Sequence, residues 1–253
     1  MTVPRSLWPR EHGAYAQLAA PLVSALLLAM PTVASVLLAV GAFAAFLANE
    51  PLLVVLGHRG PRLRATAGSR AWRRLFVLGV VSLTCTAFGV YVAGPATLRV
   101  VGIVSVAAFI LFALALGRVQ HSLVGELVAA CVLPSALAPV AVAAGIEIRA
   151  ACLLWIGWSL GYTASVIAVH RVIDRHRSRA TPANKTITAG LVAMLFGLAT
   201  AVLRFPLIAV ALPLVATSVV LAVCPPSARR LRAIGAALIV ASVVSIGLSV
   251  MII

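Results

Sequence analysis

Long apolar segments alternate with short polar or basic segments along the whole chain. Most of the apolar segments approach the ~20 residues that a helix needs to cross a bilayer, and Pro, Gly and Arg residues mark where they end. This pattern predicts nine membrane-spanning helices. We expect them near residues 13–30, 32–57, 75–93, 98–117, 122–145, 150–173, 186–203, 205–223 and 233–253. The strict apolar–polar alternation of membrane β-barrel strands is missing, which excludes that class.

The composition agrees with a polytopic all-α membrane protein. Hydrophobic residues make up 63% of the 253 positions, charged residues 10%, and the mean hydropathy is +1.15. No soluble second domain and no low-complexity tail stands out, so we expect one integral membrane domain over residues 1–253. The four cysteines form no CxxC pair and are interpreted as reduced structural residues.

Two local patterns concern helix shape and packing. Pro134 and Pro139 interrupt the fifth apolar segment, which predicts either a kink or a helix break that shapes a cavity. Gly157 and Gly161 form a GxxxG step in the sixth segment, and this step predicts close contact with another helix.

The formal net charge of +15 is interpreted as a topology signal and not as nucleic-acid binding. With the N-terminus in the cytoplasm, 17 of the 20 Lys and Arg residues fall in cytoplasmic segments. Arg99, Arg149 and Arg204 are the three that fall outside. The positive-inside rule therefore predicts a multi-pass protein of the cell (inner) membrane, with a cytoplasmic N-terminus and an external C-terminus. All five histidines and four of the five acids then lie near the cytoplasmic side, where we expect any chemistry.

The second apolar segment carries the most unusual polar residues. Asn49 and Glu50 lie deep in it and precede Pro51, and His58 and Arg59 follow at its end. A carboxylate at membrane depth costs roughly 2.5–3.5 kcal/mol on insertion scales, so it usually faces a partner or a watery cavity. We therefore expect Glu50 to face a polar cavity that opens to the cytoplasm; the alternative is a structural ion pair with an arginine of a neighbouring span.

Two further clusters lie at predicted cytoplasmic helix starts. Glu11 and His12 precede the first span, either as an acid/base pair at the mouth of the cavity or as an interfacial cap. Ser122 and Glu126 are four residues apart and share one helix face, whereas His121 points elsewhere. Glu126 is either a site residue or a surface acid.

Basic segments at 59–74 and 171–185 are expected to be loops. Their basic residues either form an electropositive lid that binds phosphate groups or only set the orientation of the protein in the membrane. His170 and Asp174 share a helix face next to the second segment. This spacing suits metal binding, an oriented imidazole or an exposed ion-pair network.

Several of these pieces together resemble a known family. The Pro9-Arg10-Glu11-His12-Gly13-Ala14 opening, the Asn49-Glu50-Pro51 helix and the His121-Ser122-x-x-Gly125-Glu126 segment look like the YwiC-like family of bacterial membrane proteins. That resemblance covers most of the chain and implies no particular reaction.

A more distant resemblance is to the UbiA superfamily of intramembrane prenyltransferases. That superfamily has nine helices around a central cavity and two acidic motifs on the cytoplasmic side. Asn49-Glu50 falls where the first motif would begin, and His170-x-x-x-Asp174, followed by Arg177, falls where the second would be. The resemblance implies a nine-helix UbiA-like bundle, Mg²⁺-bridged diphosphate binding and transfer of a prenyl chain. The motifs are degenerate, because Leu53 and Gly57 stand where carboxylates are expected and His170 replaces an acid.

The leading hypothesis is thus a divergent UbiA-like transferase that acts on an isoprenoid or other lipid-soluble substrate. The residues assigned to the cation or diphosphate are Glu50, Asn49 and Asp174, and those assigned to phosphate are Arg59, Arg62 and Arg177. Glu11 or Glu126 is assigned as the acid/base group.

Two alternatives remain open. The first is a non-enzymatic protein that binds a metal, haem or quinone through its histidines, because imidazole suits transition metals better than Mg²⁺. Its ligands would come from Glu50, Asp174, His170, His58 and His12. The second alternative is a transporter, although no internal repeat is apparent. Membrane lipids are the expected partners, and nucleic acid is not.

Overall fold

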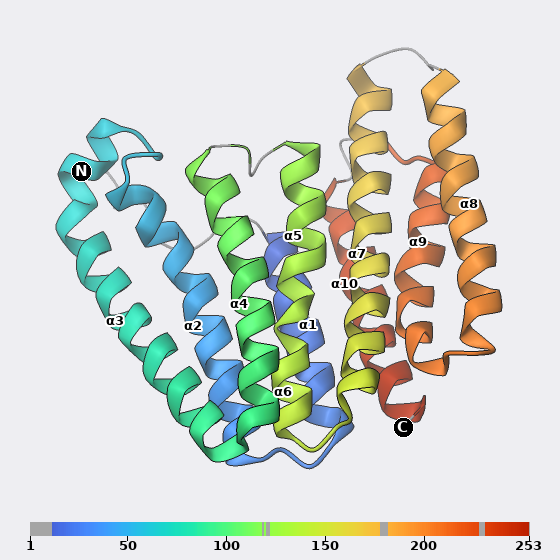
Figure 1. Cartoon of the computed structure of the whole chain (residues 1–253). Helices are drawn as coiled ribbons and strands as arrows, with labels where there is room; N and C mark the ends of the chain where they lie inside the picture. Colours follow the sequence, from blue (N-terminus) through green and yellow to red (C-terminus); the bar gives the residue numbers. More distant parts are fainter. Residues whose placement is uncertain (1–11, 118, 120–121, 178–181, 228–230, 253) are drawn as a thin grey trace.

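The computed structural model describes residues 12–117, 119, 122–177, 182–227 and 231–252. The described part of the chain is helical and contains no strand. Its elements are α1 (His12–Leu28), α2 (Val33–Val55), α3 (Pro61–Ala93), α4 (Pro95–Leu116), α5 (Leu123–Ser135), α6 (Leu137–Ala143), α7 (Ile148–Arg177), α8 (Pro182–Val202), the 3₁₀ helix η1 (Pro206–Ala211), α9 (Leu212–Val223) and α10 (Leu231–Ile252). They form an upright bundle (Figure 1).

The predicted polytopic helical bundle is confirmed, and eight of the nine predicted spans are found as candidate membrane-spanning helices among the described residues. Eight helical segments are long and apolar enough to cross a membrane, and α1 is a shorter apolar helix. The fifth span consists of α5 and α6, which meet at Ala136, two residues after Pro134. The predicted break is therefore present. The eighth span likewise combines η1 and α9.

The third helix differs from the prediction. The basic segment 59–74 was expected to be a loop, but α3 already begins at Pro61 and runs for 33 residues without interruption. Apolar length marks only the part of a helix that lies in hydrocarbon. Residues 62–74 contain no proline and are rich in Arg and Ala, which are strong helix formers, and Pro61 is favoured in the first turn. The second basic segment is also helical as far as Arg177.

Small residues set the closest helix contacts. A Cβ on Gly157 would lie 2.6 Å from Cγ2 of Val210, and one on Gly161 would lie 2.8 Å from Cδ1 of Leu214. The predicted GxxxG step is therefore confirmed as the face of α7 that packs on η1 and α9. Gly41 of α2 approaches α3 in the same way.

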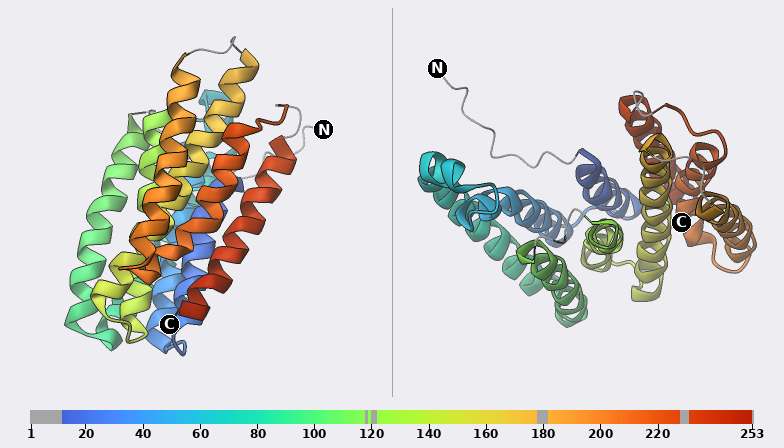
Figure 2. Two further views of the ribbon diagram at one scale, coloured as in Figure 1. Left: turned by 90° about the vertical axis from the view of Figure 1, so that its right-hand side faces the viewer. Right: turned by 90° about the horizontal axis from the view of Figure 1, so that it is seen from above.

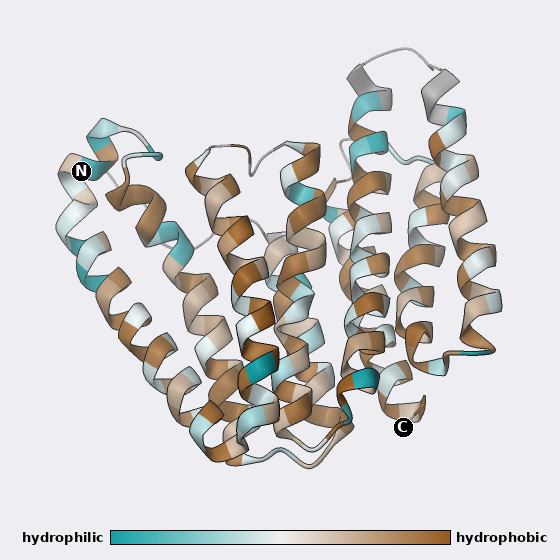
Figure 3. Ribbon diagram, viewed as in Figure 1, coloured by the Kyte–Doolittle hydropathy of each residue, from teal (hydrophilic) through white to brown (hydrophobic). Residues whose placement is uncertain are grey.

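Seen along the bundle axis, α1 and α5 lie between a group formed by α2, α3 and α4 and a group formed by α7 to α10 (Figure 2). Trp158 of α7 is fully buried in the central core. The apolar parts of α3 and α4 have few buried side chains, as expected of lipid-facing surface, and their ribbons are mostly brown in Figure 3. We call the end at which α2, α4 and α7 finish and α3, α5 and α8 begin the basic end.

Candidate functional site

An elongated cavity, here called the slot, lies between α2 and α4 and is also lined by α1, α3, α5 and α6. Its volume is about 360 Å³. One face of α2 contributes Leu38, Gly41, Ala42, Ala45, Phe46 and Asn49, and one face of α4 contributes Val101, Val104, Ser105, Ala108, Leu111, Phe112 and Ala115. At 1.5 Å of rise per residue, the α4 wall is about 20 Å long. The slot is therefore long, narrow and mainly apolar.

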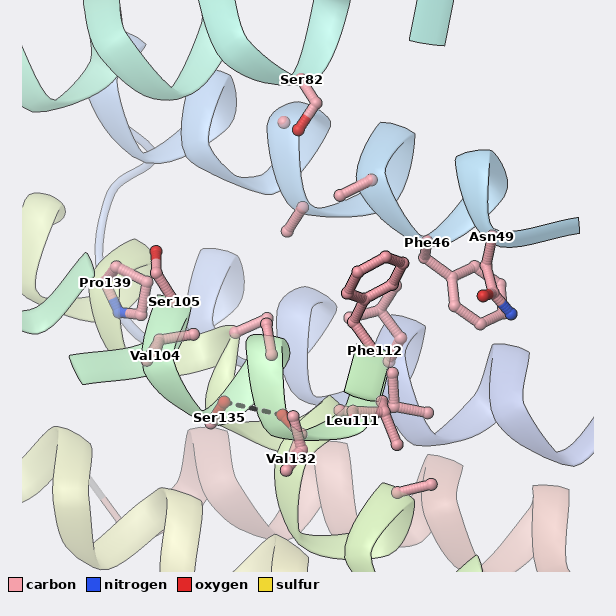
Figure 4. A pocket seen from close by; sticks show the side chains of 18 of the residues that line it. Phe46, Asn49, Ser82, Val104, Ser105, Leu111, Phe112, Val132, Ser135 and Pro139 are labelled. Carbon is pink, nitrogen blue, oxygen red and sulfur yellow. Dashed lines mark hydrogen bonds between the residues drawn. The ribbon is translucent and has the colours of Figure 1, made fainter. Parts of the chain in front are cut away.

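A few polar groups interrupt this apolar wall. Asn49 lies at one end of the slot, whereas Ser105 and Ser82 lie farther along it (Figure 4). None of these three side chains makes a hydrogen bond to another residue that the structure describes. Ser135, by contrast, donates to the carbonyl of Val132 at 2.6 Å. The Asn49 amide and the two serine hydroxyls are thus available to a ligand.

Aromatic packing fixes the wall next to Asn49. The ring of Phe46 meets the ring of Tyr15 edge-on, with 5.0 Å between centroids. The ring of Phe43 completes a cluster of three, 6.3 Å from Phe46 and 6.5 Å from Tyr15. These contacts hold Phe46 in place between α1 and the slot. Asn49 follows Phe46 by three residues, so its amide lies on the same helix face, toward the basic end.

Glu50 points away from the slot and forms an ion pair. Nε of Arg59 donates to Oε1 at 2.9 Å and Nη2 donates to Oε2 at 2.6 Å, which is a bidentate geometry. The Glu50 side chain is 6% exposed and that of Arg59 is 28% exposed. The structural alternative for Glu50 is therefore realised, with the difference that the arginine follows the same helix and does not come from a neighbouring span.

The end of α2 explains this pairing. The N–H of His58 donates to the carbonyl of Leu53 and that of Gly57 donates to Val54, which is a Schellman motif. Gly57 has φ +79°, a conformation that glycine adopts without strain. The chain turns back at this point, and Arg59 reaches Glu50.

Glu126 and His170 form the second pair. Nε2 of His170 lies 2.8 Å from Oε2 of Glu126, which joins α5 to α7. The start of α5 is fixed by Ser122, whose hydroxyl accepts from the N–H of Gly125 at 3.1 Å. The imidazole of His170, predicted to share a helix face with Asp174, thus contacts a carboxylate of another helix, because α5 packs beside α7.

The other predicted site residues are not gathered around the slot. Arg62 is exposed in the first turn of α3, and Asp174 is exposed on α7, which does not line the slot. His58 lies beside the Glu50–Arg59 pair in the chain, outside the slot lining. Glu11 and the side chains of His12 and Arg177 lie outside the described residues.

The described side chains include no group of three His, Cys, Asp or Glu that could hold a metal ion. The predicted metal ligands are instead dispersed, with Glu50 held by Arg59 and His170 held by Glu126. Among the predicted site residues whose side chains the structure describes, Asn49 is the one that lines the slot. The cavity is accordingly more apolar than the polar chamber expected from the sequence.

The YwiC-like family model matches residues 8–142 of the chain. The chain belongs to the YwiC-like family. The matched region contains α1 to α5 and all but the last residue of α6, which are the helices that line the slot, so the part shared with the family is the part that builds the cavity. No curated protein and no solved structure matches the chain. The distant similarity of this YwiC-like protein to the UbiA superfamily stays a prediction.

Sequence reasoning missed most of the slot. Its lining consists of Ala, Leu, Val, Phe and Ser residues at intervals of three and four, which is also the pattern of any packed or lipid-facing helix stripe. The available signal was the alignment of Gly41, Ala45 and Asn49 on one face of α2. A helix face that ends in an unpaired amide needs a polar neighbour or a ligand.

Proposed function

We propose that the protein binds one elongated, lipid-soluble molecule, of isoprenoid or related type, in the slot, and acts on the polar end of that molecule at the basic end of the bundle. The observation that carries this proposal is the shape and lining of the slot, about 20 Å of apolar wall with a free amide at one end. The volume of about 360 Å³ lies in the range of small-molecule sites.

The apolar wall alone would not select a ligand. Lipid tails are as apolar as leucine, so the hydrocarbon part of a ligand gains little free energy when it moves from the bilayer into an apolar slot. Selection must come from the width of the slot and from its few polar groups. Asn49, Ser82 and Ser105 offer hydrogen bonds where water does not compete, and these would favour a molecule with polar atoms at matching positions.

The reacting end is assigned to the neighbourhood of Asn49. The Glu50–Arg59 pair follows immediately. Nε and Nη2 of Arg59 donate to Glu50, so Nη1 is the guanidinium group that would remain for an anionic head group bound near Asn49. In a transferase, Arg59 and Arg62 would balance the charge of a departing diphosphate while Glu50 positions Arg59. The charge distribution further supports a location in the inner membrane with the basic end facing the cytoplasm.

A quinone is the second candidate ligand. Phe46 and Phe112 stand in the slot beside Asn49 (Figure 4), and a ring carbonyl could accept from the Asn49 amide. A quinone with an isoprenoid tail would use the same apolar wall. This candidate replaces the histidine-based site of the sequence hypothesis, because His170 is held by Glu126.

Mass spectrometry of lipids that remain with the protein purified in mild detergent tests the proposal. Ala108→Phe places a ring inside the slot, and Ala113→Phe places the same ring on α4 outside the slot lining. We expect an isoprenoid or quinone to accompany the wild type and Ala113→Phe and to be depleted in Ala108→Phe. Equal lipid content in the two variants would contradict the proposal.

The transferase form has its own test. Incubation of the purified protein with prenyl diphosphates and aromatic acceptors should release pyrophosphate, and Asn49→Ala should lower the rate while the protein remains folded. A bound quinone without turnover would instead favour the second candidate.

A further inference from the structure

A second groove lies along α3 at the basic end, and none of its lining residues lines the slot. It is lined by Arg70, Arg73, Arg74, Val77 and Leu78. These positions follow the i, i+3, i+4, i+7, i+8 pattern, so they form one continuous stripe along the helix. The stripe is cationic in its first half and apolar in its second half.

The position of this stripe matches the boundary of a bilayer. The 33 residues of α3 span about 50 Å, whereas the hydrocarbon core is about 30 Å thick. The surplus falls at the basic end, because the apolar part of the helix begins near position 75. Trp72, which is 61% exposed, lies beside the arginines, as expected of an interfacial aromatic residue. The guanidinium groups thus lie at head-group level, and Val77 lies about one turn deeper.

The charge of the groove has no counterpart on its own helix. Residues 61–93 contain no Asp or Glu, and Arg70 and Arg73 are exposed. Arg74 has an interaction of its own. No described acid forms an ion pair with Arg70 or Arg73. A phosphate group can accept two hydrogen bonds from each guanidinium fork, which makes it the natural complement of such a surface.

We propose that this face of α3 is a binding site for an anionic phospholipid of the surrounding leaflet. The phosphate of the lipid lies on Arg70 and Arg73, and one acyl chain follows Val77 and Leu78 into the hydrocarbon. The site shares no lining residue with the slot, to which α3 contributes Ser82 and Thr86 farther along the helix. It therefore adds a lipid partner that the proposed function does not require.

Native mass spectrometry of the full chain, released from nanodiscs of phosphatidylglycerol and phosphatidylcholine with identical acyl chains, tests this site. The test variant is Arg70→Gln/Arg73→Gln. The matched control is Lys185→Gln/Arg232→Gln, which removes two exposed cations from other helices at the basic end. Elution in size-exclusion chromatography verifies that both variants are folded.

The wild type and the control are expected to retain phosphatidylglycerol in preference to phosphatidylcholine. The test variant should lose this preference on the order of tenfold, since each arginine near a membrane surface contributes to anionic-lipid binding. Equal losses in the test variant and the control would overturn the proposal, because the preference would then reflect overall charge. A wild type without preference for the anionic lipid would overturn it as well.

Discussion

Replacing Arg59 by glutamine is expected to destabilise the protein more than replacing Glu50 by glutamine, although both changes remove the same two hydrogen bonds. The difference follows from burial. The Glu50 side chain is 6% exposed, whereas 28% of the Arg59 side chain remains exposed. Arg59→Gln leaves a carboxylate enclosed by protein, and Glu50→Gln leaves a guanidinium that can turn toward water.

The magnitudes can be bounded from general measurements. Removing one partner of a buried ion pair costs about 3–5 kcal/mol, because the remaining charge stays desolvated. We expect a value near the lower limit, about 3 kcal/mol, for Arg59→Gln. For Glu50→Gln we expect about 1 kcal/mol, because exposed ion pairs contribute little and the freed arginine is solvated. In the double variant two neutral amides face each other, so its loss should be smaller than the sum of the single losses.

The apparent Tm of the three variants can be measured in detergent, with size-exclusion chromatography of heated samples reporting the fraction that remains folded. A loss of 1 kcal/mol corresponds to about 2–4 °C for a chain of this size. Arg59→Gln should therefore lower the apparent Tm by roughly 6–12 °C and Glu50→Gln by roughly 2–4 °C. An equal or larger effect of Glu50→Gln, or strict additivity in the double variant, would refute the assignment of a buried carboxylate held by Arg59.

Three other predictions concern packing, the second ion pair and topology. Gly161→Ala should lower the apparent Tm, at a cost of about 1–3 kcal/mol from overpacking, whereas Gly79→Ala, where a Cβ meets open space, should leave it unchanged or raise it. A double-mutant cycle of Glu126→Gln and His170→Ala should give a coupling of only about 0.5–1 kcal/mol, because both side chains are partly exposed; a coupling above 2 kcal/mol would contradict this account. In a variant without native cysteines, Arg204→Cys should react with a membrane-impermeant thiol reagent added to intact cells, and protection from the reagent would contradict the predicted orientation.

Much of the fold follows from apolar segment length and punctuation. The break after Pro134 and the close packing at Gly157 and Gly161 were predicted because each depends on a strong local constraint, a missing N–H or a missing Cβ. The start of α3 was predicted wrongly, because helix formation at Arg62 to Arg74 continues beyond the membrane and hydropathy does not report it.

The site was harder to predict from the sequence than the fold. Asn49 and Glu50 were recognised as unusual, but their roles diverge, since neighbouring positions on a helix lie about 100° apart. Glu50 meets Arg59 because the turn at Gly57 returns the chain, a local feature that capping rules could have predicted. The contact of Glu126 with His170 depends on how α5 packs against α7, which a single sequence does not encode in any short pattern.

The most direct test of the central claim is a cryo-electron microscopy map of the wild type in nanodiscs prepared with its native lipids. The account predicts elongated density between α2 and α4 that reaches Asn49. A slot closed by contact of Ala45 with Ala108, or one filled by the ring of Phe112 without additional density, would contradict it.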